Sequence, residues 1–257
     1  MRKPSRWTTL VMMSTLTVAT ASAAQVLPGD PYWGSESSGG GSNAITATAP
    51  RSGNGSLEMF GDRTRFIGLG NPYSPLSNLG LLSNVTSLTF DWMVAIGSAG
   101  SGPGAALSYS PALRLHIWDG AQRSELIWEN AYNGGAPAVQ GSWSTTGAAD
   151  NFWRFQTGIG DSLIYDRSIS EWATSGYSAS AYVSAISVGV GGSAGAGYHA
   201  FADNVTLTLG NTSTTYNFEQ ASSVPDAGST SALLGLVLVG LAACRSLSKR
   251  SVDGTRA

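Results

Sequence analysis

The acidic residues are the first candidates for chemistry, because a glycosidase needs two carboxylates that face each other across a cleft. The central part of the chain offers five of them: Asp91, Glu125, Glu129, Asp161 and Asp166. Nothing in their spacing selects a pair. A secreted polysaccharide hydrolase is therefore kept as an alternative, and no catalytic residue is assigned.

Histidine chemistry is limited to His116 and His199. A Ser-His-Asp hydrolase needs a histidine base beside an activated serine, and no serine of this sequence lies in a GxSxG motif. The two histidines also lack the HExxH or HxH spacing of a catalytic zinc site. The single cysteine, Cys244, lies in a C-terminal apolar run, which leaves the domain before it without a disulfide or a thiolate metal site. We expect a protein that is not an enzyme.

Sugar binding is the chemistry that the aromatic residues favour, because exposed rings stack against the apolar faces of sugars. In "PALRLHIWD" the apolar residues at 113, 115 and 117 alternate with Arg114, His116 and Trp118. Strand alternation places these three on the outward face, and they are our candidate carbohydrate contacts. Trp92 shares the phase of Phe90 and Val94 and is expected in the core.

Charge is unevenly distributed along the chain. Residues 25–224 hold seven arginines, no lysine and 14 of the 16 acidic residues, so their formal net charge is 7 − 14 = −7. Nucleic-acid binding requires clustered cations, so nucleic acid is excluded as a partner. Cofactors are predicted as none; a structural calcium ion bound by loop oxygens is compatible with a sandwich, and Asp203 and Asn204 are considered for it without being assigned.

The pattern of residues 55–220 is that of short strands separated by Gly, Asn, Asp and Pro. It predicts an all-β fold, a two-sheet antiparallel sandwich. We expect hairpins around Gly61-Asp62 and Asp119-Gly120, and one short helix near residues 168–173, where Ser168 and Glu171 have capping-box spacing. The Gly/Ser-rich segment 25–54 is predicted as a flexible arm, with the first edge of the sandwich as the alternative. Glycine-rich residues 189–197 lack the lysine of a P-loop and predict a long turn.

The N-terminus predicts a signal peptide over residues 1–24. Arg2, Lys3 and Arg6 precede an apolar stretch that is too short to span a bilayer, and "ASAAQ" offers small residues for cleavage after Ala23 or Ala24. The chain is therefore expected to be exported.

The C-terminus has three parts in order. "VPDAGST" at 224–230 is followed by an apolar run at 231–244 and by a basic cluster at 245–250. The run is slightly short for a bilayer but can cross one that thins locally. The positive charges would then hold the end of the chain in the cytoplasm. A plain C-terminal membrane anchor is the alternative interpretation.

This tail resembles the PEP-CTERM sorting signals, in the variant with a VPDSG-like motif. The matching positions are Val224, Pro225, Asp226, Gly228, Ser229 and Thr230, with Ala227 where the variant usually has serine. The resemblance implies processing by an exosortase, a membrane cysteine protease-transpeptidase, in a bacterium that makes exopolysaccharide. The tail continues through "SVDGTRA", which is longer than the family pattern.

The closing segments "FADNVTLTL" and "TTYNFE" resemble the last strands of jelly-roll domains that occur in such proteins, and these domains are similar to lectin and carbohydrate-binding sandwiches. Together the patterns predict a secreted, non-catalytic surface or matrix protein. Its expected partners are an exosortase with the secretion machinery, the membrane through the C-terminal helix, and exopolysaccharide. Its expected location is the cell envelope, the cell surface or the extracellular matrix.

Overall fold

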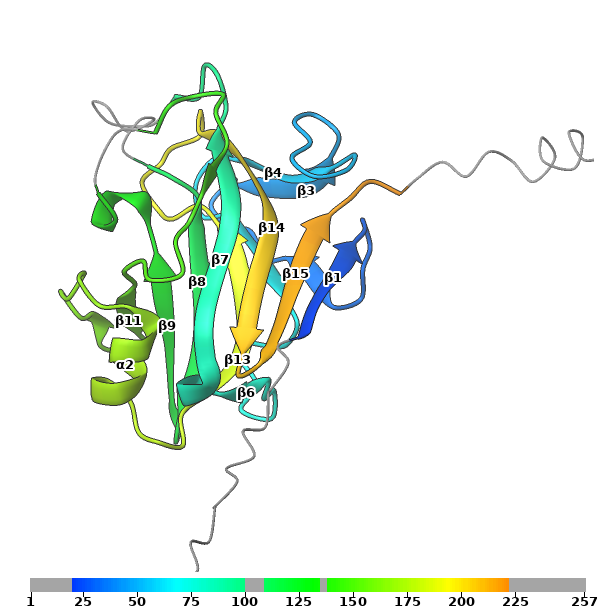
Figure 1. The fold of residues 1–257 in the computed structure, drawn as a ribbon. Helices are drawn as coiled ribbons and strands as arrows, with labels where there is room; N and C mark the ends of the chain where they lie inside the picture. The colour runs from blue at the N-terminus through cyan, green and yellow to red at the C-terminus, as the bar shows by residue number, and fades with distance from the viewer. Residues whose placement is uncertain (1–19, 100–108, 135–137, 222–257) are drawn as a thin grey trace, which may run out of the picture. The chain divides into compact units, whose positions relative to one another are not determined.

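The computed structural model describes residues 20–99, 109–134 and 138–221, which form two β-sheets with one short α-helix (Figure 1). Sheet A contains seven strands: β1 (Thr20–Val26), β3 (Ser42–Thr46), β4 (Ser56–Phe60), β7 (Val85–Val94), β10 (Ser144–Thr145), β14 (His199–Leu209) and β15 (Thr212–Phe218). Sheet B contains eight: β2 (Trp33–Ser35), β5 (Arg65–Gly68), β6 (Gly80–Leu81), β8 (Ala112–Asp119), β9 (Gln122–Trp128), β11 (Trp153–Gln156), β12 (Gly160–Asp161) and β13 (Tyr182–Gly189). The predicted all-β, two-sheet architecture is confirmed.

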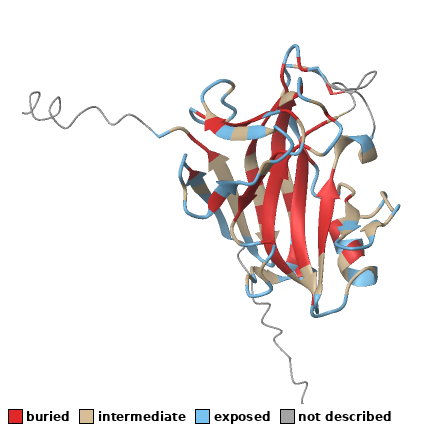
Figure 2. Ribbon diagram, turned by 180° about the vertical axis from the view of Figure 1, so that it is seen from behind, coloured by how far each residue is buried: buried red, intermediate tan, exposed pale blue. Residues whose placement is uncertain are grey.

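The order of strands puts long strands at the centre of each sheet. Sheet A runs β1-β15-β14-β4-β3, with β7 also paired to β14, and sheet B runs β12-β11-β9-β8-β13-β5-β2. The described pairings are antiparallel except for β1 with β15. Figure 2 shows the central strands buried over most of their length, while the edge strands are half-buried or exposed.

The core lies between the sheets and is filled from both by alternate residues. Phe90 and Trp92 of β7 contact Trp128 of β9, with ring centroids 5.3 and 5.9 Å apart. At the other end, Phe218 of β15 packs edge-on against Trp33 of β2 at 5.1 Å. Trp92 is buried, as its phase predicted. Aromatic rings thus join the sheets at both ends of the sandwich.

The first expected hairpin is wrong. β4 and β5 flank Gly61-Asp62, but β4 pairs with β3 and β14 in sheet A whereas β5 pairs with β2 and β13 in sheet B. A turn signal shows where the chain reverses but does not show whether it returns to the same sheet. The hairpin at Asp119-Gly120 is confirmed, because β8 pairs with β9 from Asp119 opposite Gln122.

The segment predicted as a flexible arm is the first edge of the sandwich. β2 and β3 lie within residues 25–54 and take part in sheets B and A. Trp33 and Ile45 bury their side chains in the core, so sparse apolar residues were enough to fix this Gly/Ser-rich stretch. The folded domain therefore begins before residue 55.

The predicted short helix is confirmed as α2 (Ile169–Ser175). Ser168 and Glu171 form the capping box, with each side chain accepting a backbone N–H of the other residue. Trp172 is buried on the inner side of the helix and donates its indole N–H to the carbonyl oxygen of Phe152 at 2.6 Å. Two short 3₁₀ helices, η1 (Leu82–Asn84) and η2 (Asn130–Tyr132), complete the elements.

Both predicted addressing segments lie largely outside the described residues. Of the signal peptide, only Thr20–Ala24 is described, and these residues form most of β1. Cleavage after Ala24 would leave Gln25 and the buried Val26 in place. The sorting motif, the apolar run and the basic cluster all follow Ala221 and are not described. In the described ranges no helix is long and apolar enough to cross a membrane.

Candidate functional site

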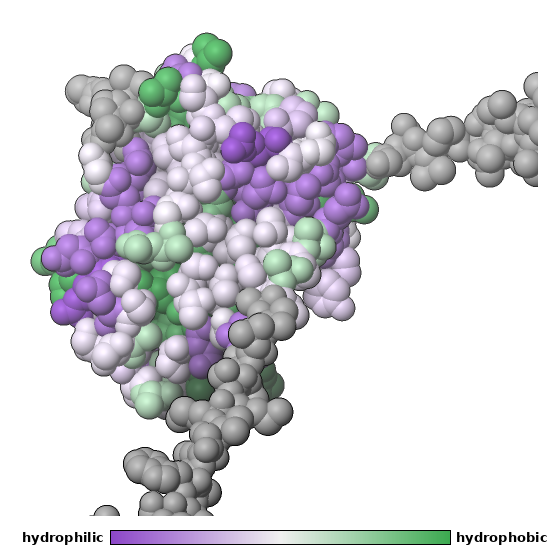
Figure 3. All heavy atoms as spheres, in the orientation of Figure 1, coloured by the Kyte–Doolittle hydropathy of each residue, from purple (hydrophilic) through white to green (hydrophobic). Residues whose placement is uncertain are grey.

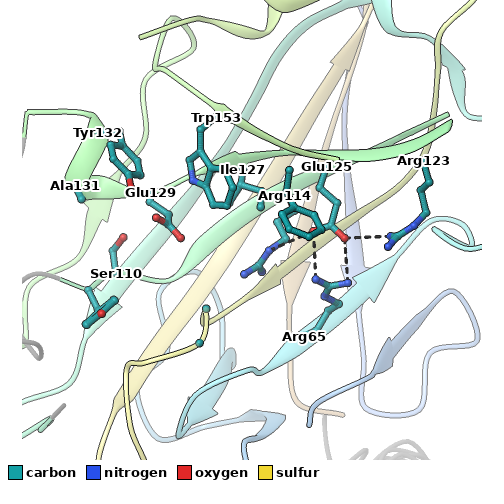
Figure 4. A pocket seen from close by; sticks show the side chains of 14 residues that line it. Arg65, Ser110, Arg114, Arg123, Glu125, Ile127, Glu129, Ala131, Tyr132 and Trp153 are labelled. Carbon is teal, nitrogen blue, oxygen red and sulfur yellow. Dashed lines mark hydrogen bonds and ion pairs between the residues drawn. The ribbon is translucent and has the colours of Figure 1, made fainter. Parts of the chain in front are cut away.

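An open cleft lies on the outer face of sheet B, opposite the core, and its volume is about 630 Å³. Its walls come from β5, β8, β9 and β11, from η2, and from two loops that contribute Ser110 and Gly191-Gly192. Figure 4 shows charged side chains clustered at one end and Tyr132, Trp153 and Glu129 at the other. The cleft is therefore a mixed surface of guanidinium, carboxylate and aromatic groups.

Strand register explains why these side chains meet. Phe155 of β11 pairs with Glu125 of β9, and Glu125 pairs with His116 of β8, so the three share one face. Trp153 and Arg114 both stand opposite Ile127 in the same way. Alternation along β9 then places Arg123, Glu125, Ile127 and Glu129 on this face, because residues two positions apart point the same way.

Glu125 is the centre of the charged end. The two terminal nitrogens of Arg65 donate to the two carboxylate oxygens of Glu125, each at 3.2 Å. Arg123 Nη1 donates to Oε1 of the same carboxylate at 3.1 Å. Burial would raise the pKa of Glu125, but the surrounding cationic groups lower it overall. Only 3% of the Glu125 side chain is exposed. The carboxylate is therefore held ionised and in a fixed position.

Arg114 lies beside this pair without completing it. Its Nε is 3.8 Å from Glu125 Oε2, too long for a hydrogen bond, and its Nη1 is buried with no hydrogen-bond partner. Burial and the neighbouring charge of Arg65 lower the pKa of Arg114, while Glu125 and Glu129 raise it in part. A guanidinium keeps its proton in proteins. The cleft thus holds a positive charge that is only partly compensated.

Glu129 marks the aromatic end. Burial raises the pKa of Glu129, against the opposing influence of Arg114 and the Trp153 indole. Trp153 and Phe155 are two positions apart on β11, and Tyr132 stacks on Tyr165 with ring centroids 4.3 Å apart. These rings offer flat apolar surfaces next to polar groups.

The three predicted carbohydrate contacts have different positions. Arg114 lines the cleft, as described. His116 shares its face but is 0% exposed, and its Nε2 contacts Ser187 Oγ at 2.8 Å. Burial lowers the pKa of His116 to about 3, so the ring is neutral. His116 lies on the outward face, as alternation predicts, but the expectation that it is accessible to a sugar is wrong, because side chains of the neighbouring strands, Glu125 and Ser187 among them, contact its ring.

Trp118 is half-buried and lies beyond the cleft. Its indole N–H donates to the carbonyl oxygen of Pro72 at 3.2 Å, so the loop after β5 fixes it. Trp118 is not among the residues that line the cleft. The three predicted contacts therefore do not form one platform.

Sequence reasoning missed the residues that accompany Arg114 in the cleft. Glu125 and Glu129 were among the five candidate acids, but nothing selected them; their alternation with Arg123 at every second position was a usable signal. The other three acids are elsewhere: Asp91 lies on sheet A, while Asp161 and Asp166 are exposed. Arg65 and Trp153 come from strands distant in sequence, and only the sheet order brings them to Glu125.

The two residues considered for calcium have other contacts. Asp203 accepts hydrogen bonds from the backbone N–H groups of Ser52, Asn204 and Phe218. Asn204 donates its side-chain amide to Ser52 and Asp91. Among the described residues no group of three or more metal-ligating side chains is present. No residue in this part of the chain is assigned to an ion.

Comparison with known families identifies the tail. Residues 223–248 match the model of the VPDSG-CTERM motif. The match covers the predicted sorting motif, the apolar run and part of the basic cluster, and it confirms the resemblance stated from the sequence. A search of curated proteins found no match. The tail carries a PEP-CTERM-type sorting signal, which implies export, processing by an exosortase-type system and a location at the envelope or surface.

Proposed function

We propose that this exported protein is a non-catalytic, carbohydrate-binding surface or matrix protein whose sugar site is the outer cleft of sheet B. The observation that carries the proposal is the cleft itself, in which Trp153, Phe155 and Tyr132 lie beside fixed charged groups. Aromatic rings contact the apolar faces of sugars, and charged side chains hydrogen-bond their hydroxyls. A volume of about 630 Å³ is in the range of small-ligand sites.

The sorting tail supports the same role. A protein that is exported and processed at the envelope is placed where exopolysaccharide is assembled or held. The jelly-roll and lectin-like character expected from the closing strands is compatible with the two-sheet sandwich. Polysaccharide is therefore the partner that both the tail and the cleft favour.

Sugar binding is tested with two matched tryptophans. Trp153→Ala removes a ring from the cleft, whereas Trp143→Ala removes a half-buried ring packed beside sheet A, where Arg51 covers it at 5.9 Å. We expect Trp153→Ala to weaken binding of the full-length, detergent-solubilised chain to polysaccharides in affinity electrophoresis by about tenfold or more. Equal retardation of wild type and both variants would remove the cleft as the site.

A secreted glycosidase is the second candidate, and one observation favours it. Glu125 and Glu129 share the cleft, with the pKa of one lowered and that of the other raised, as in an ionised nucleophile and a protonated acid. Against it, Glu125 is 3% exposed and both its oxygens bind Arg65. An attack on a sugar would require that carboxylate to leave its partners.

Hydrolysis is tested by release of reducing sugar from the polysaccharides that bind. We expect none above the background of the Glu129→Gln variant. Release by wild type that is lost in Glu129→Gln would replace the binding role with a hydrolase.

Sorting is tested with Pro225→Ala in the native cells. We expect the wild-type protein to lose both ends and to reach the surface or matrix, and the variant to accumulate uncut at its C-terminus in the inner membrane. A full-length C-terminus in the wild type, unchanged by the substitution, would leave only a plain membrane anchor.

A further inference from the structure

The charged end of the cleft has more positive than negative charge. Arg65, Arg114 and Arg123 surround Glu125, and His116 beneath them is neutral. Glu129 adds at most one further negative charge, and burial raises its pKa. Three guanidinium groups therefore face one firmly ionised carboxylate and a second carboxyl group that is protonated more readily. The surplus remains although the domain as a whole is acidic, with a formal charge of −7 over residues 25–224.

The surplus is concentrated at Arg114. Its side chain is 6% exposed, so water compensates it poorly, and its Nη1 has no hydrogen-bond partner. Arg65 and Arg123 hydrogen-bond Glu125, whereas Arg114 makes only a longer ion pair with it at 3.8 Å. In Figure 4 the Arg114 guanidinium lies between Glu125 and the Glu129 end, facing into the cleft. Burying a charged donor without an acceptor is costly unless a ligand supplies one.

The surroundings of Arg114 also define the shape of the missing group. Trp153 of β11 and Arg114 of β8 both pair with Ile127 of β9. The Trp153 ring and the Arg114 guanidinium therefore lie on the same face, with β9 between their strands. The loop at Gly191 closes the far side, where an added Cβ would lie 3.7 Å from Glu129 Oε1. A sugar ring on Trp153 would thus carry its substituents toward Arg114.

We propose that the cleft selects anionic glycans and that Arg114 binds the carboxylate of a uronic acid residue. This inference rests on the proposed sugar-binding function and names its ligand class. A planar carboxylate matches the planar fork of a guanidinium, which makes two parallel hydrogen bonds to it. The same charge would also attract a sulfate ester, and the experiment separates the two sources.

The test uses three galactose-based polymers: polygalacturonate, a neutral galactan and a sulfated galactan. Affinity electrophoresis and calorimetry are done with the full-length chain in detergent at low and at moderate salt. We expect polygalacturonate to bind about tenfold or more tightly than the neutral galactan, with affinity that falls as salt rises. We also expect it to bind more tightly than the sulfated polymer.

Two variants locate the effect. Arg114→Met removes the charge and is expected to lower polygalacturonate affinity by about tenfold or more. Arg51→Met removes an arginine between β3 and β4, beside sheet A, that is 39% exposed, and it should not change glycan binding. Gly191→Phe keeps every charge but fills the cleft, since Gly191 has no left-handed backbone angle and an added Cβ meets only Glu129; it should also lose binding. Thermal unfolding of each variant confirms that it is folded.

The outcomes separate this inference from the proposed function. Tighter binding of the neutral galactan would overturn the anionic selectivity and keep the sugar site. Preference for the sulfated polymer would overturn the carboxylate assignment, as would full binding by Arg114→Met. If no polymer binds the wild type, or if Gly191→Phe binds as well as the wild type, both the inference and the proposed function fail.

Discussion

The outer faces of the two sheets both bury charged side chains, but they satisfy them differently. On sheet A, Asp91 accepts from Arg51, Asn204 and Thr145, and Glu58 accepts from two threonines and contacts His199 at 2.8 Å. On sheet B, Glu125 is equally well bound, yet Arg114 beside it keeps a buried nitrogen without a partner. On the first face the carboxylates are paired within the protein, and the buried atom without a partner is the neutral Asn217 Oδ1; on the second face one such atom is a charged guanidinium nitrogen at a cleft.

This difference separates a structural network from a binding site. Buried polar groups are normally hydrogen-bonded. A charged network in which each group has its partners within the protein therefore only stabilises the fold. Figure 3 shows the surface over β7 and β14 as pale to weakly polar, consistent with the threonines and serines of that face. An unsatisfied donor at a cavity instead indicates a partner that the protein does not itself supply. The predictions below test whether the faces differ in this way.

The largest expected effect is loss of the charge at Glu125. Glu125→Gln leaves three arginines around a neutral group, and breaking a buried ion pair from one side costs about 3–5 kcal/mol. Glu129→Gln, directly after β9, is the matched control, because burial raises the pKa of Glu129 and no arginine is hydrogen-bonded to it in the described contacts. Chemical denaturation should show a large loss for the first variant and little change for the second. Equal losses of unfolding free energy in the two variants would mean that the ion pairs of Glu125 with the arginines do not stabilise the fold.

Asp203 on sheet A gives the next effect. Asp203→Ala leaves the backbone N–H groups of Ser52, Asn204 and Phe218 without an acceptor. Because an orphaned buried donor costs about 1–3 kcal/mol, and water can reach some of them, we expect a loss of about 3 kcal/mol. Binding of glycans should be unchanged in this variant, since Asp203 lies on sheet A and does not line the cleft. Lost binding with unchanged stability would reverse the roles assigned to the two faces.

The two carboxylates should also respond oppositely to pH. The pKa of Glu125 is lowered in the folded state, so its stabilisation is present above its unfolded value near 4.5 and is lost as pH falls below it. Burial raises the pKa of Asp203 to about 6. The contribution of Asp203 to the free energy of unfolding is therefore greatest below about pH 4 and falls as pH rises through 6. Unfolding free energies of wild type and Glu125→Gln should converge as pH falls below 4.5 and through the lowered pKa of Glu125. Those of wild type and Asp203→Ala should differ less at pH 7 than at pH 4.

The sequence supplied the parts of this molecule that depend on local pattern. The alternation of β7 and β8, the Asp119-Gly120 hairpin and the Ser168 capping box were all visible in short stretches. The sorting tail was visible because its three parts are contiguous. The assignment of β4 and β5 to different sheets was not, since it depends on pairing with β13 and β14, more than a hundred residues later.

The candidate site shows the same limit. Alternation correctly put Arg114 and His116 on the face away from the core, but accessibility depends on what neighbouring strands place above them. Arg65 precedes Glu125 by sixty residues, and only the sheet order brings their side chains together. A residue pattern can thus predict which face of a strand a side chain lies on. Which side chains it contacts there depends on the order of the strands in the folded sheet.

The smallest expected effect on stability is at Arg114 itself. Arg65→Met should destabilise the protein, because it removes two hydrogen bonds from a buried carboxylate. Arg114→Met removes a buried charge that no hydrogen bond to Glu125 compensates, so the free energy of unfolding should stay within about 1 kcal/mol of wild type or increase. Arg51→Met removes a side chain that is 39% exposed, and Asp91 keeps its hydrogen bonds from Asn204 and Thr145, so the free energy of unfolding should change by about 1 kcal/mol or less. Denaturation of the three variants in parallel measures this order. A loss at Arg114 as large as that at Arg65 would show that Arg114 belongs to the structural network, because a side chain without a hydrogen bond inside the protein should contribute little to the stability of the fold.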